Sequence, residues 1–351
     1  MTASRFRGSL AVWLLLIAYA SLYPFWPLRL PSADALAAGL AKPRYVLPFD
    51  VVLNVIAYVP LGVLATLYFA GESVRGRSVA RAVAFGAATS LAMECCQLFI
   101  PNRVASLYDV AANTAGTLAG ALAFVDPFHS VVTRALARWR EETFMPGAWG
   151  DAGLMLVALW LLAQLNPALP FFGAGNIAAP GDGVPRAEAL EWLAVALAIA
   201  GFGLFASAIL RGEAGTLRAT LLLLSAALWL KFVAASVMLQ PHFSDEWVTS
   251  GRFVGIAVGL AALAPLRRLP RAGRLYLAIL CILAGALLSK IFGAYSPLDE
   301  LLHLFRWPYG QLASFTTLTR FLHELWPLAA LTFLIALFLR ERRAARAIIP
   351  G

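Results

Sequence analysis

The chain has 351 residues, of which 61% are hydrophobic and only 13% are charged, and its mean hydropathy is +0.76. Soluble globular domains carry roughly 25% charged residues, so this composition excludes an ordinary soluble enzyme. It predicts an all-α, polytopic transmembrane helix bundle.

The net charge of +9 does not indicate a nucleic-acid partner, because the arginines stand in short segments between apolar runs, where they determine topology. Three cysteines cannot form a disulfide framework, and since all three lie in apolar runs we expect them to be small buried residues. The sequence contains no CxxC, no HExxH and no His/Cys cluster. We therefore expect no metal site and no cofactor.

Ten apolar runs are long enough to cross a hydrocarbon core of about 30 Å, the shortest only just. They cover residues 9–27, 50–70, 80–100, 107–125, 151–172, 188–210, 217–239, 251–266, 274–292 and 321–339. We interpret residues 1–126 as a four-helix transmembrane unit, 127–150 as a basic cytoplasmic linker and 151–351 as a six-helix unit of unassigned role. For the first run a cleaved signal peptide is the alternative, because Ala18-Tyr19-Ala20 resembles a cleavage site.

The basic residues predict the orientation of these runs. Ten spans leave eighteen of the 28 Lys and Arg residues on the side that holds both termini and eight on the other side, with Lys231 and Lys290 inside spans. Because Lys and Arg accumulate in cytoplasmic loops, we expect an inner or plasma membrane protein with both termini in the cytoplasm.

Seven polar residues interrupt the apolar sequence between residues 50 and 120. They are Asp50, Asn54, Glu94, Gln97, Arg103, Asp109 and Asn113. Such residues are costly in lipid and are retained for a partner or a function. Within the spans they recur at i,i+3 or i,i+4, so each helix presents them on one face, and the predicted topology puts all seven near the outer membrane face. We expect them to form one outward-facing pocket.

Structural explanations remain open for several of these residues. Asp50 and Asp109 suit the positive N-terminal ends of their helices, and Asn54 and Asn113 suit interhelical hydrogen bonds. The motif from Gly116 to Gly120 is typical of close helix packing.

As an ordered set, the residues of this region resemble the VanZ-like membrane proteins, a family named for an accessory teicoplanin-resistance protein. The resemblance is carried by Asp50, Asn54, Pro60, Gly62, Glu94, Gln97, Arg103, Asp109, Asn113 and Gly116, and by Ser21-Leu22-Tyr23-Pro24-Phe25. It covers about residues 10–126 and implies a cell-envelope context, with a link to glycopeptide resistance, but no defined reaction.

The remaining sequence contributes three accessory site candidates, Lys231, His303 and Arg306. Lys231 lies about 12 Å inside its span at helical rise, too deep for an ordinary loop charge. His303 and Arg306 lie in the polar stretch 293–320, which we interpret as an outer loop with an interfacial or re-entrant segment.

The leading functional hypothesis is recognition or modification of a lipid headgroup or a lipid-linked cell-wall precursor. Arg103 suits phosphate or carboxylate, the amides suit hydroxyl and amide groups, and Glu94 is the best candidate for acid/base catalysis. Whether the protein is an enzyme stays open, as does its oligomeric state. The alternatives are a proton- or cation-coupled transporter and a non-catalytic scaffold in envelope assembly.

Overall fold

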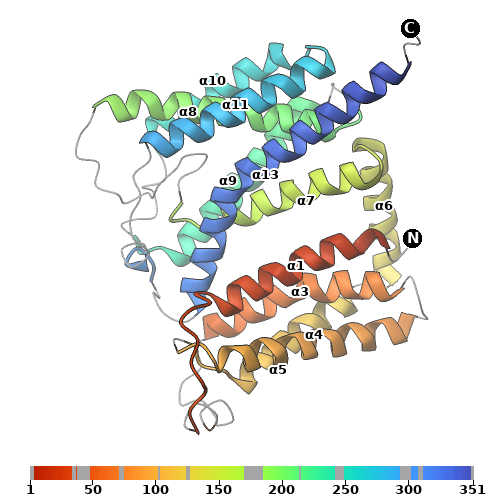
Figure 1. Ribbon diagram of the computed structural model, residues 1–351, viewed down its shortest axis with the longest axis vertical. Helices are drawn as coiled ribbons and strands as arrows, with labels where there is room; N and C mark the ends of the chain where they lie inside the picture. The colour runs from red at the N-terminus through yellow and green to blue at the C-terminus, as the bar shows by residue number, and fades with distance from the viewer. Residues whose placement is uncertain are drawn as a thin grey trace. The chain divides into compact units, whose positions relative to one another are not determined.

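The computed structural model describes residues 4–33, 37, 48–70, 75–101, 103–123, 127–169, 185–212, 215–241, 249–292, 302–306 and 311–348. In these ranges the regular elements are helices, so the all-α prediction is confirmed (Figure 1). The helices are α1 (Ser4–Leu22), α3 (Pro48–Ala70), α4 (Arg75–Gln97), α5 (Leu107–Leu122), α6 (Pro127–Thr143), α7 (Gly147–Gln164), α8 (Pro185–Ile209), α9 (Thr216–Met238), α10 (Ser250–Leu266), α11 (Arg271–Phe292) and α13 (Gln311–Ile348).

A helix coincides with every one of the ten predicted apolar runs. Among the described residues, seven helices are long and apolar enough to cross a membrane: α3, α4, α7, α8, α9, α11 and α13. The helices α1 and α10 are apolar but shorter. The structure is therefore consistent with a helical membrane bundle, while the count of ten crossings stays a prediction.

The chain divides into two compact units. The first comprises Met1–Arg138 and Tyr309–Leu318, and the second comprises Trp139–Pro308 and Thr319–Gly351. The predicted basic linker, 127–150, contains α6 and the start of α7, and the division falls within α6.

Glycines bring α3 and α5 together in the first unit. A Cβ atom at Gly116 would overlap the carbonyl oxygen of Val55, and one at Gly120 would overlap that of Val59. A Cβ at Gly62 would in turn overlap the backbone of α5. These three positions therefore require glycine for steric reasons, which matches the close-packing interpretation of Gly116 and Gly120.

Helix α1 packs as an integral part of this unit. Leu10 and Ile17 are buried in its apolar core, and Trp13 donates from Nε1 to the carbonyl of Ala57 on α3 at 2.9 Å. These contacts make α1 part of the core of the first unit.

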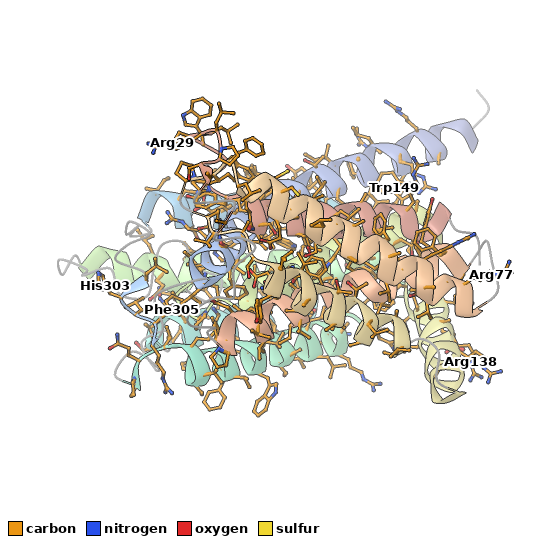
Figure 2. The ribbon with its side chains drawn as sticks, turned by 90° about the horizontal axis from the view of Figure 1, so that it is seen from below. Arg29, Arg77, Arg138, Trp149, His303 and Phe305 are labelled. Atoms are coloured by element: carbon orange, nitrogen blue, oxygen red, sulfur yellow. The ribbon has the colours of Figure 1, made fainter. Side chains whose placement is uncertain are left out.

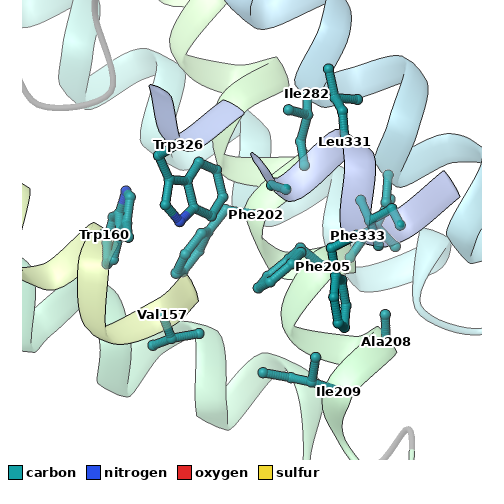
Figure 3. Close-up of a cluster of buried hydrophobic side chains, with 14 of the residues drawn as sticks. Val157, Trp160, Phe202, Phe205, Ala208, Ile209, Ile282, Trp326, Leu331 and Phe333 are labelled. Atoms are coloured by element: carbon teal, nitrogen blue, oxygen red, sulfur yellow. The ribbon is translucent and has the colours of Figure 1, made fainter. Parts of the chain in front are cut away.

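Helix α8 is the central element of the second unit. Of its membrane-length segment 78% is buried, against 28% for α11, as expected for a helix that is apolar on all sides. Phe202 of α8 contacts Trp160 of α7 and Trp326 of α13, with ring centroids 4.2 and 5.8 Å away (Figure 3). Large aromatic side chains thus connect α13 to the core.

Two details of the sequence interpretation are wrong. Residues 311–320 are the first turns of α13 and not part of a loop. Their hydroxyl groups are compatible with a helix: Thr317 donates to the carbonyl of Ala313 at 2.8 Å, and Thr319 accepts from Nδ2 of Asn166 at 2.9 Å. Cys95 and Cys96 are exposed on the protein surface and not buried.

The two ends of each unit carry different side chains. In the first unit Arg29 lies at one end and Arg77 and Arg138 lie at the other (Figure 2). In the second unit His303 and Phe305 lie at one end and Trp149 at the other.

Candidate functional site

Three helices of the first unit each carry polar residues one turn apart on a single face. Helix α3 has three, α4 has two and α5 has two. We call these seven residues the polar cluster: Asp50, Asn54, Tyr58, Ser90, Glu94, Asp109 and Asn113. Burial increases along each series, because Asp50 and Asp109 are half-buried whereas Tyr58, Ser90 and Asn113 are 3%, 0% and 5% exposed.

The deep end of the polar cluster is held by one hydrogen bond between α5 and α4. Asn113 donates from Nδ2 to Oγ of Ser90 at 2.8 Å. Within the described residues, Asn113 Oδ1 and Tyr58 Oη are buried without a hydrogen-bond partner, although Tyr58 Oη lies near Ser90. Buried polar atoms without partners are uncommon in folded proteins and indicate a place for water or a ligand.

Glu94 anchors the turn that leads into α5. Its Oε2 accepts a hydrogen bond from the backbone N–H of Ser106 at 2.7 Å, and Ser106 is the N-cap of α5, where its hydroxyl accepts from the N–H of Tyr108. A carboxylate on an N-cap amide also complements the positive end of the helix. Glu94 therefore has a structural partner whatever its chemical role.

Arg103 binds the C-terminal end of α1. It donates from Nε to the carbonyl of Tyr23 and from Nη2 to the carbonyl of Ala20, both at 3.0 Å, and Nη2 also contacts Oγ of Ser314. The last carbonyls of a helix have no intrahelical donor, so a cation there satisfies them and complements the negative helix end. Burial lowers the pKa of Arg103, and the charge of Glu94 opposes this shift.

Gln97 bonds to the same end of α1. Its Nε2 donates to the carbonyl of Ser21 at 3.1 Å, and its side chain is 4% exposed. Gln97 and Arg103 together fix α1 against the end of α4, so both contribute to the fold of the unit.

The half-buried end of the polar cluster is acidic. The carboxylates of Asp50 and Asp109 are close enough to repel each other, and the side chain of Asn54 lies beside Asp109. Nδ2 of Asn54 is buried but reaches no acceptor at hydrogen-bonding distance among the described residues. With Glu94 the cluster contains three carboxylates, and the charge of Arg103 acts on that of Glu94.

All seven polar residues predicted from the sequence thus lie in the first unit, in two kinds of surroundings. Glu94, Gln97 and Arg103 bond to backbone groups at helix ends. The aspartates and asparagines face one another between α3 and α5.

The three accessory candidates belong to the second unit. Lys231 is 0% exposed and donates from Nζ to the carbonyls of Asn166 and Leu169, both at 2.8 Å. It therefore holds the turn that follows α7. Arg306 donates to the carbonyl of Leu239 at 2.7 Å.

His303 is exposed, and its backbone carbonyl accepts from Nε2 of Gln240 at 2.8 Å. His303 and Arg306 thus lie in the segment that pairs with the end of α9, through the bridge between Leu239 and Phe305. Among the residues that the structure describes, no group of three His, Cys, Asp or Glu side chains is placed to hold a metal ion.

Sequence reasoning missed four residues of this region: Tyr58, Ser90, Ser106 and Ser314. Tyr58 follows Asn54 by four residues and Ser90 precedes Glu94 by four, so the helical repeat carried a signal for both. Ser106 was recognisable as an N-cap before an apolar run. Ser314 is 211 residues from Arg103, and no local pattern connects the two.

A comparison with protein families gives one match. Residues 6–131 match the VanZ/LLP1 family model, which confirms the resemblance seen in the sequence and covers α1 to α5 and the start of α6. Comparison of the chain with curated proteins and with solved structures gave no significant match.

Proposed function

We propose that the VanZ-like N-terminal unit of this multi-pass membrane protein recognises the headgroup of a cell-envelope lipid or a lipid-linked cell-wall precursor at the outer leaflet. The observation that carries the proposal is the buried Oδ1 of Asn113, which has no hydrogen-bond partner among the described residues. It lies in a cluster where the carboxylates of Glu94 and Asp109 are near each other.

A buried acceptor without a donor favours a ligand that donates. Neighbouring carboxylates such as Glu94 and Asp109 are stabilised by a cation or a proton between them. An ammonium group, a hydroxyl group or an amide N–H on the ligand supplies what the cluster lacks. The preferred headgroup is therefore rich in donors.

Phosphate is a weaker candidate for the recognised group. The Nε and Nη2 of Arg103 already bond to Tyr23, Ala20 and Ser314. A bidentate phosphate contact through that edge would break the cap of α1. The neighbouring carboxylates of Glu94 and Asp109 also repel an anion.

If the unit acts on its ligand, Glu94 is the residue we assign to proton transfer. It is 6% exposed and lies between the acidic end and the deep end of the cluster, with one oxygen bonded to Ser106. A carboxylate in apolar surroundings suits acid/base work. A contribution to teicoplanin-type resistance would follow from modification or shielding of a cell-wall precursor.

The experiment compares two lipids that differ in their donors. Phosphatidylethanolamine carries N–H donors in its headgroup and phosphatidylcholine does not, although both are zwitterionic. With identical acyl chains, we expect the purified protein to retain more of the former, measured by native mass spectrometry. The preference should be about threefold or more, the equivalent of the ~0.6 kcal/mol of an average interhelical hydrogen bond.

Matched substitutions locate the effect. Asp109→Asn should abolish the preference, whereas Asp151→Asn should preserve it, because Asp151 pairs with Arg140 in the second unit. Equal retention of both lipids by the wild-type protein would refute headgroup recognition by donors.

Proton- or cation-coupled transport is the second candidate, because the neighbouring carboxylates of Glu94 and Asp109 could bind a proton or a cation. Protonophore-sensitive flux in proteoliposomes, lost in Asp109→Asn, would identify a transporter. Saturable lipid binding without flux or turnover would leave a recognition or scaffold role.

A further inference from the structure

One end of the second unit is rich in arginine. Trp149 lies at this end (Figure 2), and Cζ of Arg340 lies 5.4 Å from the centre of its ring. An ion pair at 2.9 Å joins Arg271 at the start of α11 to Glu341 near the end of α13, so two arginine-rich segments meet here. We call their arginines the arginine cluster: Arg267, Arg268, Arg271, Arg274, Arg340, Arg342 and Arg343.

Further contacts hold the helix ends together. Arg271 donates from Nη2 to the carbonyl of Ala208, in the last turn of α8, at 3.0 Å. Arg211 follows α8 and donates from Nε to the carbonyl of Phe144, also at 3.0 Å. The end of α8 and the start of α11 are therefore fixed beside the ion pair between Arg271 and Glu341.

The positive balance of this end follows from a count over the sequence and does not depend on how any one arginine is paired. The segments 139–151, 210–218, 265–274 and 340–351 of the second unit contain eleven arginines and five acidic residues, Glu141, Glu142, Asp151, Glu213 and Glu341. Two of the five already bind arginines, in the Arg140–Asp151 and Arg271–Glu341 pairs. A surplus of arginines remains even if the other three are paired as well. On the same predicted side the first unit holds seven arginines and two acidic residues, Glu72 and Asp126, so it does not reverse the balance.

Four members of the arginine cluster are exposed: Arg268, Arg340, Arg342 and Arg343. The helices beside them offer few carboxylates, because α10 and α11 contain no Asp or Glu and α13 contains only Glu324 and Glu341. Glu324 contacts Lys290 and Arg320, and Glu341 contacts Arg271. Exposed guanidinium groups at this end can therefore bind an anion from outside the protein.

Exposed apolar side chains begin where the arginine cluster ends. Tyr276 of α11 is 55% exposed and follows Arg274 by two residues, and Leu339 of α13 is 48% exposed and directly precedes Arg340. Tyr is enriched at the boundary between hydrocarbon and headgroups, and Arg side chains extend from there to the headgroups. Helix α13, with 38 residues or about 57 Å, is also much longer than a hydrocarbon core of about 30 Å. The arginine cluster therefore lies at the level of the headgroups, in the leaflet that is cytoplasmic in the predicted topology.

We propose that the arginine cluster binds the phosphate groups of anionic lipids in this leaflet. A guanidinium group can bind a phosphate through two parallel hydrogen bonds, and basic residues immediately beside a membrane helix attract anionic lipids. Tyr276 and Leu339 favour a lipid over a soluble anion, because they place the cluster next to hydrocarbon. The surface lies in the second unit and does not depend on the function proposed for the first.

The test uses phosphatidylglycerol and phosphatidylcholine that carry the same photoactivatable group at the glycerol end of one acyl chain, each as a trace component of bilayers around the full-length protein. After illumination, mass spectrometry of peptides identifies the labelled residues. We expect phosphatidylglycerol to label residues 265–276 and 336–344 several times more than phosphatidylcholine. The preference should fall in 1 M salt, where the Debye length is about 3 Å instead of about 10 Å at 0.1 M.

Matched substitutions locate the effect. Arg268→Gln and Arg343→Gln should each lower labelling of these residues by phosphatidylglycerol about fivefold, the equivalent of ~1 kcal/mol for one basic residue. Arg29→Gln should leave it unchanged, because Arg29 is an exposed arginine of the first unit. Glu341→Gln should raise it, because Arg271 loses its carboxylate partner.

The opposite signs separate lipid binding from a loss of folding, which would lower labelling in every variant of the second unit. Equal labelling by the two lipids, or a fall in Glu341→Gln, would overturn the proposal. Unlabelled phosphatidylglycerol should compete with the labelling, whereas inorganic phosphate at the same concentration should not. Equal competition by inorganic phosphate would show that the surface binds soluble anions and not a lipid.

Discussion

Substitution of Arg103 tests whether this residue stabilises the fold or binds a ligand. In the structure it makes three contacts, to two carbonyls at the end of α1 and to Ser314. Arg103→Ala removes all three and leaves those carbonyls without their donor. We therefore expect α1 to pack less firmly and the whole first unit to lose stability.

The magnitude follows from the number of bonds. Charge-assisted hydrogen bonds contribute about 1.5–3 kcal/mol each in soluble proteins, whereas interhelical bonds in membranes average about 0.6 kcal/mol. Three bonds at the membrane average give a loss of about 2 kcal/mol in the free energy of unfolding. Arg103→Lys should lose less, because an ammonium group keeps the charge but cannot reproduce the fork of the guanidinium.

Unfolding in increasing sodium dodecyl sulfate, followed by circular dichroism, measures the loss. Arg77→Ala is the control, because Arg77 is an exposed residue at the opposite end of the unit from Arg29 (Figure 2). If Arg103→Ala unfolded like Arg77→Ala but lost its headgroup preference, the cap interpretation would be refuted and Arg103 would be a ligand-binding residue.

Three further predictions test the site, the packing and the topology. Glu94→Gln keeps an acceptor for the N–H of the α5 N-cap, so the free energy of unfolding should be unchanged while the headgroup preference falls. An unchanged headgroup preference would exclude a role for the charge of Glu94. Gly116→Ala should destabilise the protein by about 1–3 kcal/mol through overpacking, whereas Gly8→Ala, with no atom within 4 Å of the new Cβ, should not. An impermeant thiol reagent should label Val104→Cys from outside and leave Ala344→Cys protected, and labelling of the latter in intact cells would reverse the orientation.

The sequence was sufficient for the parts of this fold that depend on side-chain type. Apolar runs located a helix at each predicted span, and the i,i+4 repeat of Asp50 with Asn54 and of Asp109 with Asn113 placed each pair on one helix face. Both signals arise within a single helix. They need no knowledge of which helices are neighbours.

The same reasoning could not predict contacts to the backbone. Arg103 bonds to the carbonyls of Tyr23 and Ala20, and every residue has a carbonyl, so no pattern of side chains marks these two as acceptors. Tyr58 was missed for a different reason. Its ring counts as apolar in hydropathy, although its hydroxyl lies in the polar cluster.

The start of α13 was predicted wrongly because hydropathy counts its threonines as polar. The hydroxyl of Thr317 donates to the carbonyl of Ala313 four residues earlier. A hydroxyl satisfied inside its own helix is far less costly to bury than hydropathy implies. Polar residues of this kind therefore lengthen a helix without breaking it.

The polar residues of the first unit fall into two groups, according to whether they bond to backbone groups at helix ends. Glu94, Gln97 and Arg103 bond to backbone groups that every helix end must satisfy, so the fold alone accounts for those bonds. Asp109 lies beside Asp50 and Asn54 between α3 and α5, away from the carbonyls that Arg103 and Gln97 bind. The proposed donor-rich headgroup would therefore bind at the aspartates and asparagines, and Arg103 would contribute by securing the end of α1.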